Sequence, residues 1–232
     1  GSAGVAKGKV FIIAAHAIET PKLLLMSRGE RTPNGVANSS DQVGRNLMSQ
    51  ASLDTRGLTA EPIYPYRGPI TTAGVVELRD GDFRSHFAAV GTSMLNRGWE
   101  FAIGPLELSK QLAAKGLRGQ LLKEELNRQL SRQLYLDSAA EMLPDPNNRI
   151  VPDFDHRDAL GLPRPRIRIK VDDYTKAGLE VARKRHDAIC AALKCTDVHT
   201  EPITGSVAII AGTTRMGADP KTSVVDVNMR SH

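Results

Sequence analysis

The sequence contains few of the residues that cross-link chains or stack on nucleic-acid bases. It has two cysteines in 232 residues, Cys190 and Cys195. A helical separation of five residues turns them about 140° apart, which disfavours a disulfide. Aromatic side chains make up 4% of the chain, which leaves little material for a base-stacking platform. Although the formal charge is +5, we therefore do not expect nucleic acid to be a partner.

Long apolar runs and metal-binding spacings are missing from the sequence as well. No stretch approaches the roughly 20 apolar residues of a membrane-spanning helix, and the visible segment has no signal-peptide pattern. The six histidines lack the spacing of metal ligands, which disfavours a zinc site. With 41% hydrophobic and 25% charged residues, the composition is that of a soluble globular protein, and a cytoplasmic location is favoured.

The N-terminal part has the pattern of a strand followed by a helix. Residues 9–15 (Lys-Val-Phe-Ile-Ile-Ala-Ala) form the continuous apolar run of a strand buried on both faces of a parallel sheet. Thr20 is then predicted as the N-cap of a helix and Pro21 as its first residue. Such a unit can direct the start of a helix at an anionic ligand, although the same geometry is common in α/β proteins.

The central part has the pattern of an antiparallel sheet with helices. Short β-branched stretches divided by Gly, Pro and Asp begin near residue 51. Leucines spaced by three and four residues predict two helices within 106–134. A further helix follows Asp172 or Asp173, either of which can cap it; residues 183–186 within that helix are predicted to form a surface charge run.

Residues 164–171 alternate between basic and non-basic side chains. The alternation predicts a half-buried strand whose basic face carries Arg164, Arg166, Arg168 and Lys170. This face is either a wall that contacts an anion or simply open to solvent, as one side of an antiparallel sheet commonly is. A nucleic-acid-binding module that uses this face is a further hypothesis for the function of the chain.

The order of these elements predicts an α/β fold with an α+β insert. Residues 1–50 are expected to be part of a parallel-sheet domain, and 51–204 an inserted domain with an antiparallel sheet and helices. Residues 205–232 then return to the first domain. The chain lacks an initiating Met and opens directly before the predicted strand, and a specific run at 212–226 stops six residues before the chain ends. We therefore expect it to be a piece truncated at both ends.

The run at 212–226, which starts Gly-Thr-Thr-Arg-Met-Gly, is too specific to be a packing pattern. It resembles the opening of the C-terminal conserved region of the glucose-methanol-choline (GMC) family of flavin-dependent oxidoreductases. Residues 14–27 are similar to its second signature, and 34–48 to the loop that follows. Residues 143–151 and 158–165 match the entry to the last strands of its substrate domain.

The resemblance implies oxidation of an alcohol, sugar or polyol by hydride transfer to FAD. Residues 1–50 and 205–232 would then belong to the FAD-binding domain and 51–204 to the substrate-binding domain, with oxygen, a quinone or a cytochrome as the electron acceptor. The residues that the resemblance places near the cofactor are Ala15, His16, Ala17, Thr20, Gly212 and Thr213. Ordinary helix capping by Thr20 and a tight turn at Gly212 are the structural alternatives.

The chain also departs from the pattern of the family. Ile209 stands where the family has a histidine that acts as a base or hydrogen-bond partner, and His16 stands where it usually has glycine. The Gly-x-Gly-x-x-Gly fingerprint is absent. The resemblance therefore assigns no catalytic residue to this chain, and we expect the isolated piece to be inactive. A noncatalytic relative that acts in binding or assembly is the alternative.

Overall fold

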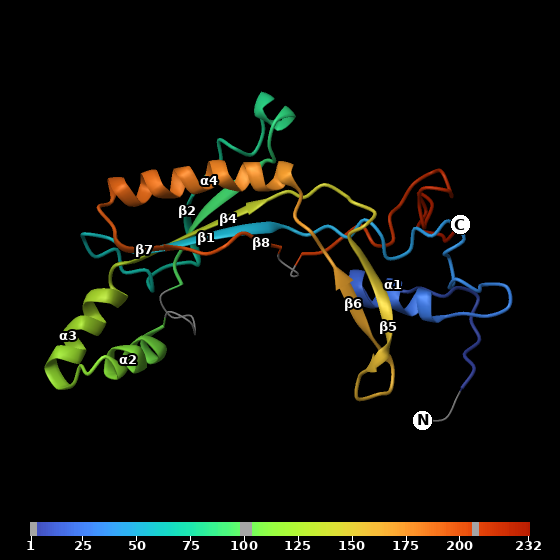
Figure 1. Ribbon diagram of the computed structural model, residues 1–232, viewed down its shortest axis with the longest axis horizontal. Helices are drawn as coiled ribbons and strands as arrows, with labels where there is room; N and C mark the ends of the chain where they lie inside the picture. The colour runs from blue at the N-terminus through green and yellow to red at the C-terminus, as the bar shows by residue number, and fades with distance from the viewer. Residues whose placement is uncertain (1–3, 98–103, 206–208) are drawn as a thin grey trace. The chain divides into compact units, whose positions relative to one another are not determined.

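The computed structural model describes residues 4–97, 104–205 and 209–232 (Figure 1). Its contacts divide the chain into two compact units, which are described separately. Unit 1 contains Gly1–Met48, Pro144–Lys170 and Ile209–His232, and unit 2 contains Ser49–Leu143 and Val171–Ala208. The domain division expected from the sequence, with boundaries after residues 50 and 204, stays a prediction. Contacts group residues 144–170 with unit 1.

Unit 2 is built on a six-stranded antiparallel sheet with the order β2-β3-β4-β1-β7, in which β8 also pairs with β1. The strands are β1 (Ala51–Leu58), β2 (Thr71–Val75), β3 (Val90–Leu95), β4 (Gln133–Ala140), β7 (Thr196–Thr200) and β8 (Thr204–Gly205). The two central strands, β1 and β4, pair over their whole length. The sheet predicted from the β-branched stretches is therefore present.

Helices complete unit 2. The long helix α4 (Asp173–Ala192) lies along one face of the sheet (Figure 1). The leucine spacing correctly predicted two helices, α2 (Pro105–Ala114) and α3 (Gly119–Leu130), and a short 3₁₀ helix, η1 (Asp82–Ser85), precedes β3. The carboxylate of Asp172 accepts the backbone N–H of Thr175 at 2.8 Å. This bond confirms the predicted capping of α4.

The alternation of side chains along β1 and β4 gives the sheet two different faces. Leu134 and Leu136 of β4 form a buried cluster with Cys190 of α4, so this face is the core of unit 2. Tyr135 and Asp137, which alternate with these leucines along β4, point to the other face. That face carries Asp54 of β1 and Asp137 of β4, which are directly opposite in the register.

One histidine is fully buried between α4 and the sheet. His186 is hydrogen bonded through Nδ1 to the Thr55 hydroxyl and through Nε2 to the Ser138 hydroxyl, both at 2.8 Å. Thr200 extends this network to β7, with its hydroxyl 2.9 Å from that of Thr55. Burial lowers the pKa of His186 to about 4. The ring is therefore neutral at pH 7, and the prediction of a surface charge run is wrong at this residue.

Unit 1 consists of helix α1 (His16–Met26), the hairpin of β5 (Arg149–Arg157) and β6 (Pro163–Arg168), and loops. Its buried cluster contains Leu24 and Leu25 of α1 together with Val43 and Val224. Because two of these four residues come from loops, much of the unit depends on backbone hydrogen bonds between loops rather than on a sheet.

The buried strand predicted over 9–15 is wrong. These residues form no regular element, and Val10, Phe11 and Ile12 are exposed. A buried strand needs neighbours on both edges, and no described segment pairs with this run. Among the described residues the fold is therefore a mixture of helices and antiparallel sheets, and the expected parallel sheet stays a prediction. Both cysteines are free thiols, as the spacing predicted.

Candidate functional site

The start of helix α1 contains four of the six residues predicted near a cofactor. The helix begins at His16, whose φ of 68° lies in the left-handed region that favours glycine. Thr20 is therefore not the N-cap, and the prediction that the helix starts after it is wrong. From inside the helix, its hydroxyl accepts the N–H of Ala15 at 2.9 Å. Pro21 lies within the helix rather than at its first position.

Pro21 explains how this helix connects to the second predicted segment. Proline has no N–H, so the carbonyl of Ala17, four residues earlier, loses its intrahelical donor. The Thr213 hydroxyl donates to that carbonyl at 2.7 Å, and Thr213 is almost completely buried. Ala17 and Thr213, far apart in the sequence, are thus in direct contact. We call this contact, with its flanking residues Ala15, Thr20 and Gly212, the junction.

Gly212 holds the junction at a distance that no other residue allows. Its φ is 94°, and a Cβ built there would lie 1.9 Å from the carbonyl oxygen of Asn46. On the next residue, the Thr213 carbonyl accepts the N–H of Gly44 at 2.8 Å. Gly212 therefore serves a close approach between two loops. The glycine at this position is thus required by packing, independently of any ligand at the junction.

The remaining signature residues are arranged differently. His16 and Ala15 are exposed, whereas Ala17 and Thr20 are half-buried. Ile209, at the position of the family histidine, is 62% exposed and has no group that accepts a proton. The junction is therefore a small, mostly backbone-lined surface without an acid or base of its own.

The open face of the sheet in unit 2 carries a group that the sequence did not reveal. Asp54 and Asp137 face each other across β1 and β4, and like charges in this position destabilise a sheet. Burial raises the pKa of Asp137, and the neighbouring Asp54 raises it further through its charge and a hydrogen bond. The Tyr135 hydroxyl donates to Asp54 Oδ2 at 2.8 Å.

Two arginines lie beside the same tyrosine. The guanidinium carbons of Arg56 and Arg97 are 5.2 Å and 5.3 Å from the centre of the Tyr135 ring, within cation–π range. Burial, followed by the bond to Asp54, raises the pKa of Tyr135. Asp54, Arg56, Tyr135 and Asp137 are called the polar platform below. It offers carboxylate acceptors and guanidinium donors side by side, which suits a ligand rich in hydroxyl groups.

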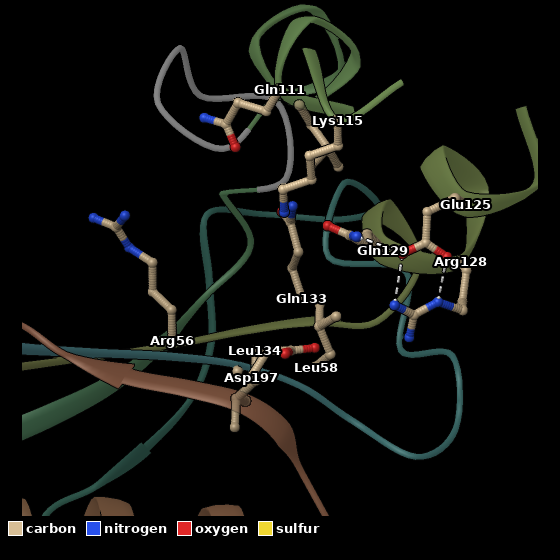
Figure 2. Close-up of a pocket in the computed structure, with 12 residues that line it drawn as sticks. Arg56, Leu58, Gln111, Lys115, Glu125, Arg128, Gln129, Gln133, Leu134 and Asp197 are labelled. Atoms are coloured by element: carbon tan, nitrogen blue, oxygen red, sulfur yellow. Dashed lines mark hydrogen bonds and ion pairs between the residues drawn. The ribbon is translucent and has the colours of Figure 1, made fainter. Parts of the chain in front are cut away.

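A hollow of about 460 Å³ adjoins the platform at Arg56. Figure 2 shows side chains from α2, α3 and the sheet strands around it. One ion pair on its wall is satisfied internally: Arg128 donates to both carboxylate oxygens of Glu125, at 2.8 Å and 2.7 Å. These bonds lower the pKa of Glu125 to about 2. Gln111, Lys115 and Gln133 give the rest of the wall a polar character.

Neither unit presents a metal site within the described residues, where no three His, Cys, Asp or Glu side chains are grouped suitably. None of the helices in the same part of the chain is long and apolar enough to span a membrane.

The chain is similar over nearly its whole length to part of an oxidoreductase. It is 39% identical over 224 residues to the fructose dehydrogenase large subunit of Gluconobacter japonicus, covering 97% of this chain and 40% of that protein. It is 25% identical to 2-methyl-1,2-propanediol dehydrogenase of Mycolicibacterium austroafricanum, covering 94% and 40%. The chain thus spans about two fifths of the length of these relatives. No family model matches it.

A shorter similarity connects the chain to an oxidase. Over 56 residues it is 41% identical to paromamine 6'-oxidase of Streptomyces fradiae, covering 24% of this chain and 10% of that protein. Each of these relatives is named as a dehydrogenase or an oxidase. The similarity therefore supports an oxidoreductase, as expected from the sequence.

Proposed function

We propose that this chain is part of a GMC-type flavoprotein that oxidises a CH–OH group of a sugar, polyol or other alcohol. The observation that carries the proposal is the similarity to the fructose dehydrogenase large subunit over 97% of the chain. The propanediol dehydrogenase and the paromamine oxidase extend the comparison to further enzymes named for hydroxyl-bearing compounds.

The junction is the proposed FAD contact in unit 1. Its side chains are small, and the exposed residues Ala15 and His16 are the N-cap and the first residue of α1. These features fit a flat ring system that approaches the backbone closely. Ala15, His16, Ala17 and Thr20 would contact the cofactor from the start of α1 and Gly212 from the neighbouring loop. The buried Thr213 would support the site by holding that loop against α1 through its hydroxyl. When bound, flavin supplies the hydride acceptor for the oxidised carbon.

The polar platform is the proposed contact for substrate hydroxyls in unit 2. Asp54 and the Asp137 carboxyl can accept hydrogen bonds from neighbouring hydroxyls, while the Arg56 guanidinium can donate to others. Ile209 cannot remove the hydroxyl proton, so the base must be another group. We assign no residue to that role, and the electron acceptor is likewise not assigned.

The noncatalytic alternative is favoured by one observation, the replacement of a histidine by Ile209. The experiment that separates the two proposals is purification of the full-length protein, followed by release and identification of any flavin. A panel of sugars, polyols and simple alcohols is then added without oxygen. Bleaching of the flavin supports the oxidoreductase, and bound flavin that no compound bleaches supports the noncatalytic relative. Absence of flavin contradicts the cofactor assignment.

A further inference from the structure

A second hollow lies within unit 1 and is separate from the junction residues. It measures about 250 Å³ and is lined by parts of α1, the 34–41 loop and the β5–β6 hairpin. Three of its lining side chains are arginines, Arg28, Arg149 and Arg166, and the only carboxylate among them belongs to Asp41. We call this hollow the arginine pocket. Its lining has an excess of positive charge.

Asp41 cannot neutralise this charge, because it is already engaged. Arg45 forms a short ion pair with its Oδ2 and also donates to its backbone carbonyl. The nearest pocket arginine, Arg149, is 3.8 Å from Asp41 Oδ1, at the outer limit of an ion pair. The Asp41 carboxylate is therefore paired mainly with Arg45.

Arg149 is the least compensated of the three arginines. Burial, followed by the charge of Arg45, lowers its pKa, which means that its surroundings disfavour its charge. Its Nε is buried and has no hydrogen-bond acceptor among the described residues. A buried guanidinium N–H without an acceptor is costly, and an added acceptor with negative charge would remove that cost.

The other two arginines are held in different ways. Arg28 donates through Nε to the Leu25 carbonyl at 3.1 Å, and its guanidinium lies 5.2 Å from the centre of the Phe154 ring. Both contacts fix the position of the group without neutralising it. Arg166 is exposed on β6, and no described carboxylate lies within ion-pair distance of it.

We propose that the arginine pocket binds a small oxyanion, a phosphate or carboxylate group carried by a small molecule. Planar guanidinium groups match the oxygens of these anions in pairs, and three of them around one hollow would repel a cation. The volume suits a small metabolite rather than a dinucleotide. The proposal also resolves the two interpretations of the basic strand at 164–171: Arg166 contacts the anion, while the neighbouring arginines do not.

Those neighbours provide a matched control. Arg168 has the same charge on the same strand and is also exposed, yet it does not line the pocket. Arg164 instead donates to the Arg157 carbonyl at 3.0 Å. Arg166→Gln and Arg168→Gln thus remove one positive charge each from the same strand, and only the first removes a side chain that lines the pocket, although Arg168 lies opposite Arg149 in the hairpin register.

The test is the binding of inorganic phosphate, and separately of succinate, to the full-length protein by calorimetry at constant ionic strength. We expect at least one of the two anions to bind to the wild type and to Arg168→Gln with similar affinity, and about tenfold more weakly to Arg166→Gln. Arg149→Lys, which keeps the charge but loses the planar fork, should weaken binding as well. The anion that binds more tightly identifies the ligand group.

The proposal is overturned if neither anion binds to the wild type, or if Arg166→Gln and Arg168→Gln weaken binding equally. Flavin content is measured in every variant. Because the pocket shares no residue with the junction, we expect that content to be unchanged. Anion binding thus tests the pocket proposal, and flavin content tests the proposed function. Either proposal can fail while the other stands.

Discussion

The two units position the side chains of their candidate sites in different ways. In unit 1, loops are tied by a hydroxyl, a proline and a glycine: Thr213 replaces the donor that Pro21 lacks, and Gly212 admits the Asn46 carbonyl. In unit 2, a regular antiparallel register places the polar platform, and its side chains are separated along the chain but adjacent across two strands. A site made of loops depends on single residues, whereas a site on a sheet tolerates substitution of its polar groups.

The largest effect is expected at Gly212. Gly212→Ala must place a Cβ 1.9 Å from the Asn46 carbonyl oxygen, at a φ of 94°. Backbone strain and overpacking together should lower the free energy of unfolding of unit 1 by roughly 4 kcal/mol. Chemical denaturation measures it.

Gly116 provides the matched control for that substitution. Its φ of 92° is almost the same, but a Cβ there would meet nothing within 4 Å. Gly116→Ala should therefore cost only the backbone strain, about 1–2 kcal/mol. Equal losses in the two variants would show that the close approach to Asn46 contributes nothing.

The next effect concerns the buried histidine of unit 2. The folded pKa of His186 is about 4, below the value of about 6.5 in an unfolded chain. Between these pH values the histidine binds a proton in the unfolded state but not in the folded state. Its contribution to the free energy of unfolding is therefore complete above pH 6.5 and is lost as the pH decreases toward 4. The loss is on the order of 3 kcal/mol. Denaturation at a series of pH values measures it.

His186→Gln should abolish this part of the pH dependence, although it also lowers stability at every pH because hydroxyl partners in the core change. His199→Gln is the control, since His199 is largely exposed. If the free energy of unfolding of His186→Gln changes with pH between 4 and 6.5 as much as that of the wild type, His186 is not the group that causes the pH dependence.

Substitutions in the polar platform should act on substrate more than on folding. Asp137→Asn removes a repulsion with Asp54, so we expect the free energy of unfolding to change by less than about 1 kcal/mol. If the platform binds hydroxyls, kcat/KM of the full-length enzyme should fall about tenfold or more, because the amide of asparagine replaces one carboxyl oxygen that can accept from a substrate hydroxyl. Asp155→Asn, which changes an exposed carboxylate on the hairpin of unit 1, is the control for charge alone. Unchanged kcat/KM in Asp137→Asn would remove Asp137 from the substrate site.

The smallest effect is expected for the thiols. Burial raises the pKa of Cys190 to about 11 and also raises that of Cys195. Because the thiolate is the reactive form, both should react slowly with a disulfide reagent at neutral pH in the native protein and quickly after denaturation. Rapid labelling of either thiol in the native state would show that it is less buried than described.

The sequence predicted those parts of the structure that depend on local pattern. The helices within 106–134, the cap at Asp172 and a strand within the predicted stretch 164–171, present as β6, follow from spacing and capping rules, which act over a few residues. The predicted half-burial of that strand is wrong at Ile167, which is 38% exposed. The resemblance singled out 212–213 as a cofactor contact, with a tight turn as the alternative, and the cofactor contact stays a prediction. The close approach of Gly212 to Asn46 was seen only in the structure.

Long-range pairing accounts for what the sequence did not predict. The apolar run at 9–15 has the composition of a buried strand, but a strand also requires neighbours, which local pattern does not supply. Asp54 and Asp137 became a pair only through the register of β1 and β4. His186 was misplaced because its charged neighbours in the sequence hide its position on the buried stripe of α4. Thr20 was misassigned because its hydroxyl reaches back to Ala15 from inside the helix.

The most direct test of the proposed oxidoreductase is the rate at which flavin is bleached in the full-length protein under anaerobic, single-turnover conditions. A sugar or polyol that bleaches it is compared with the same compound deuterated at the carbon that becomes oxidised. Transfer of hydride from that carbon predicts that bleaching slows several-fold with the deuterated compound. Flavin that stays oxidised with every sugar, polyol and alcohol tested would contradict the account.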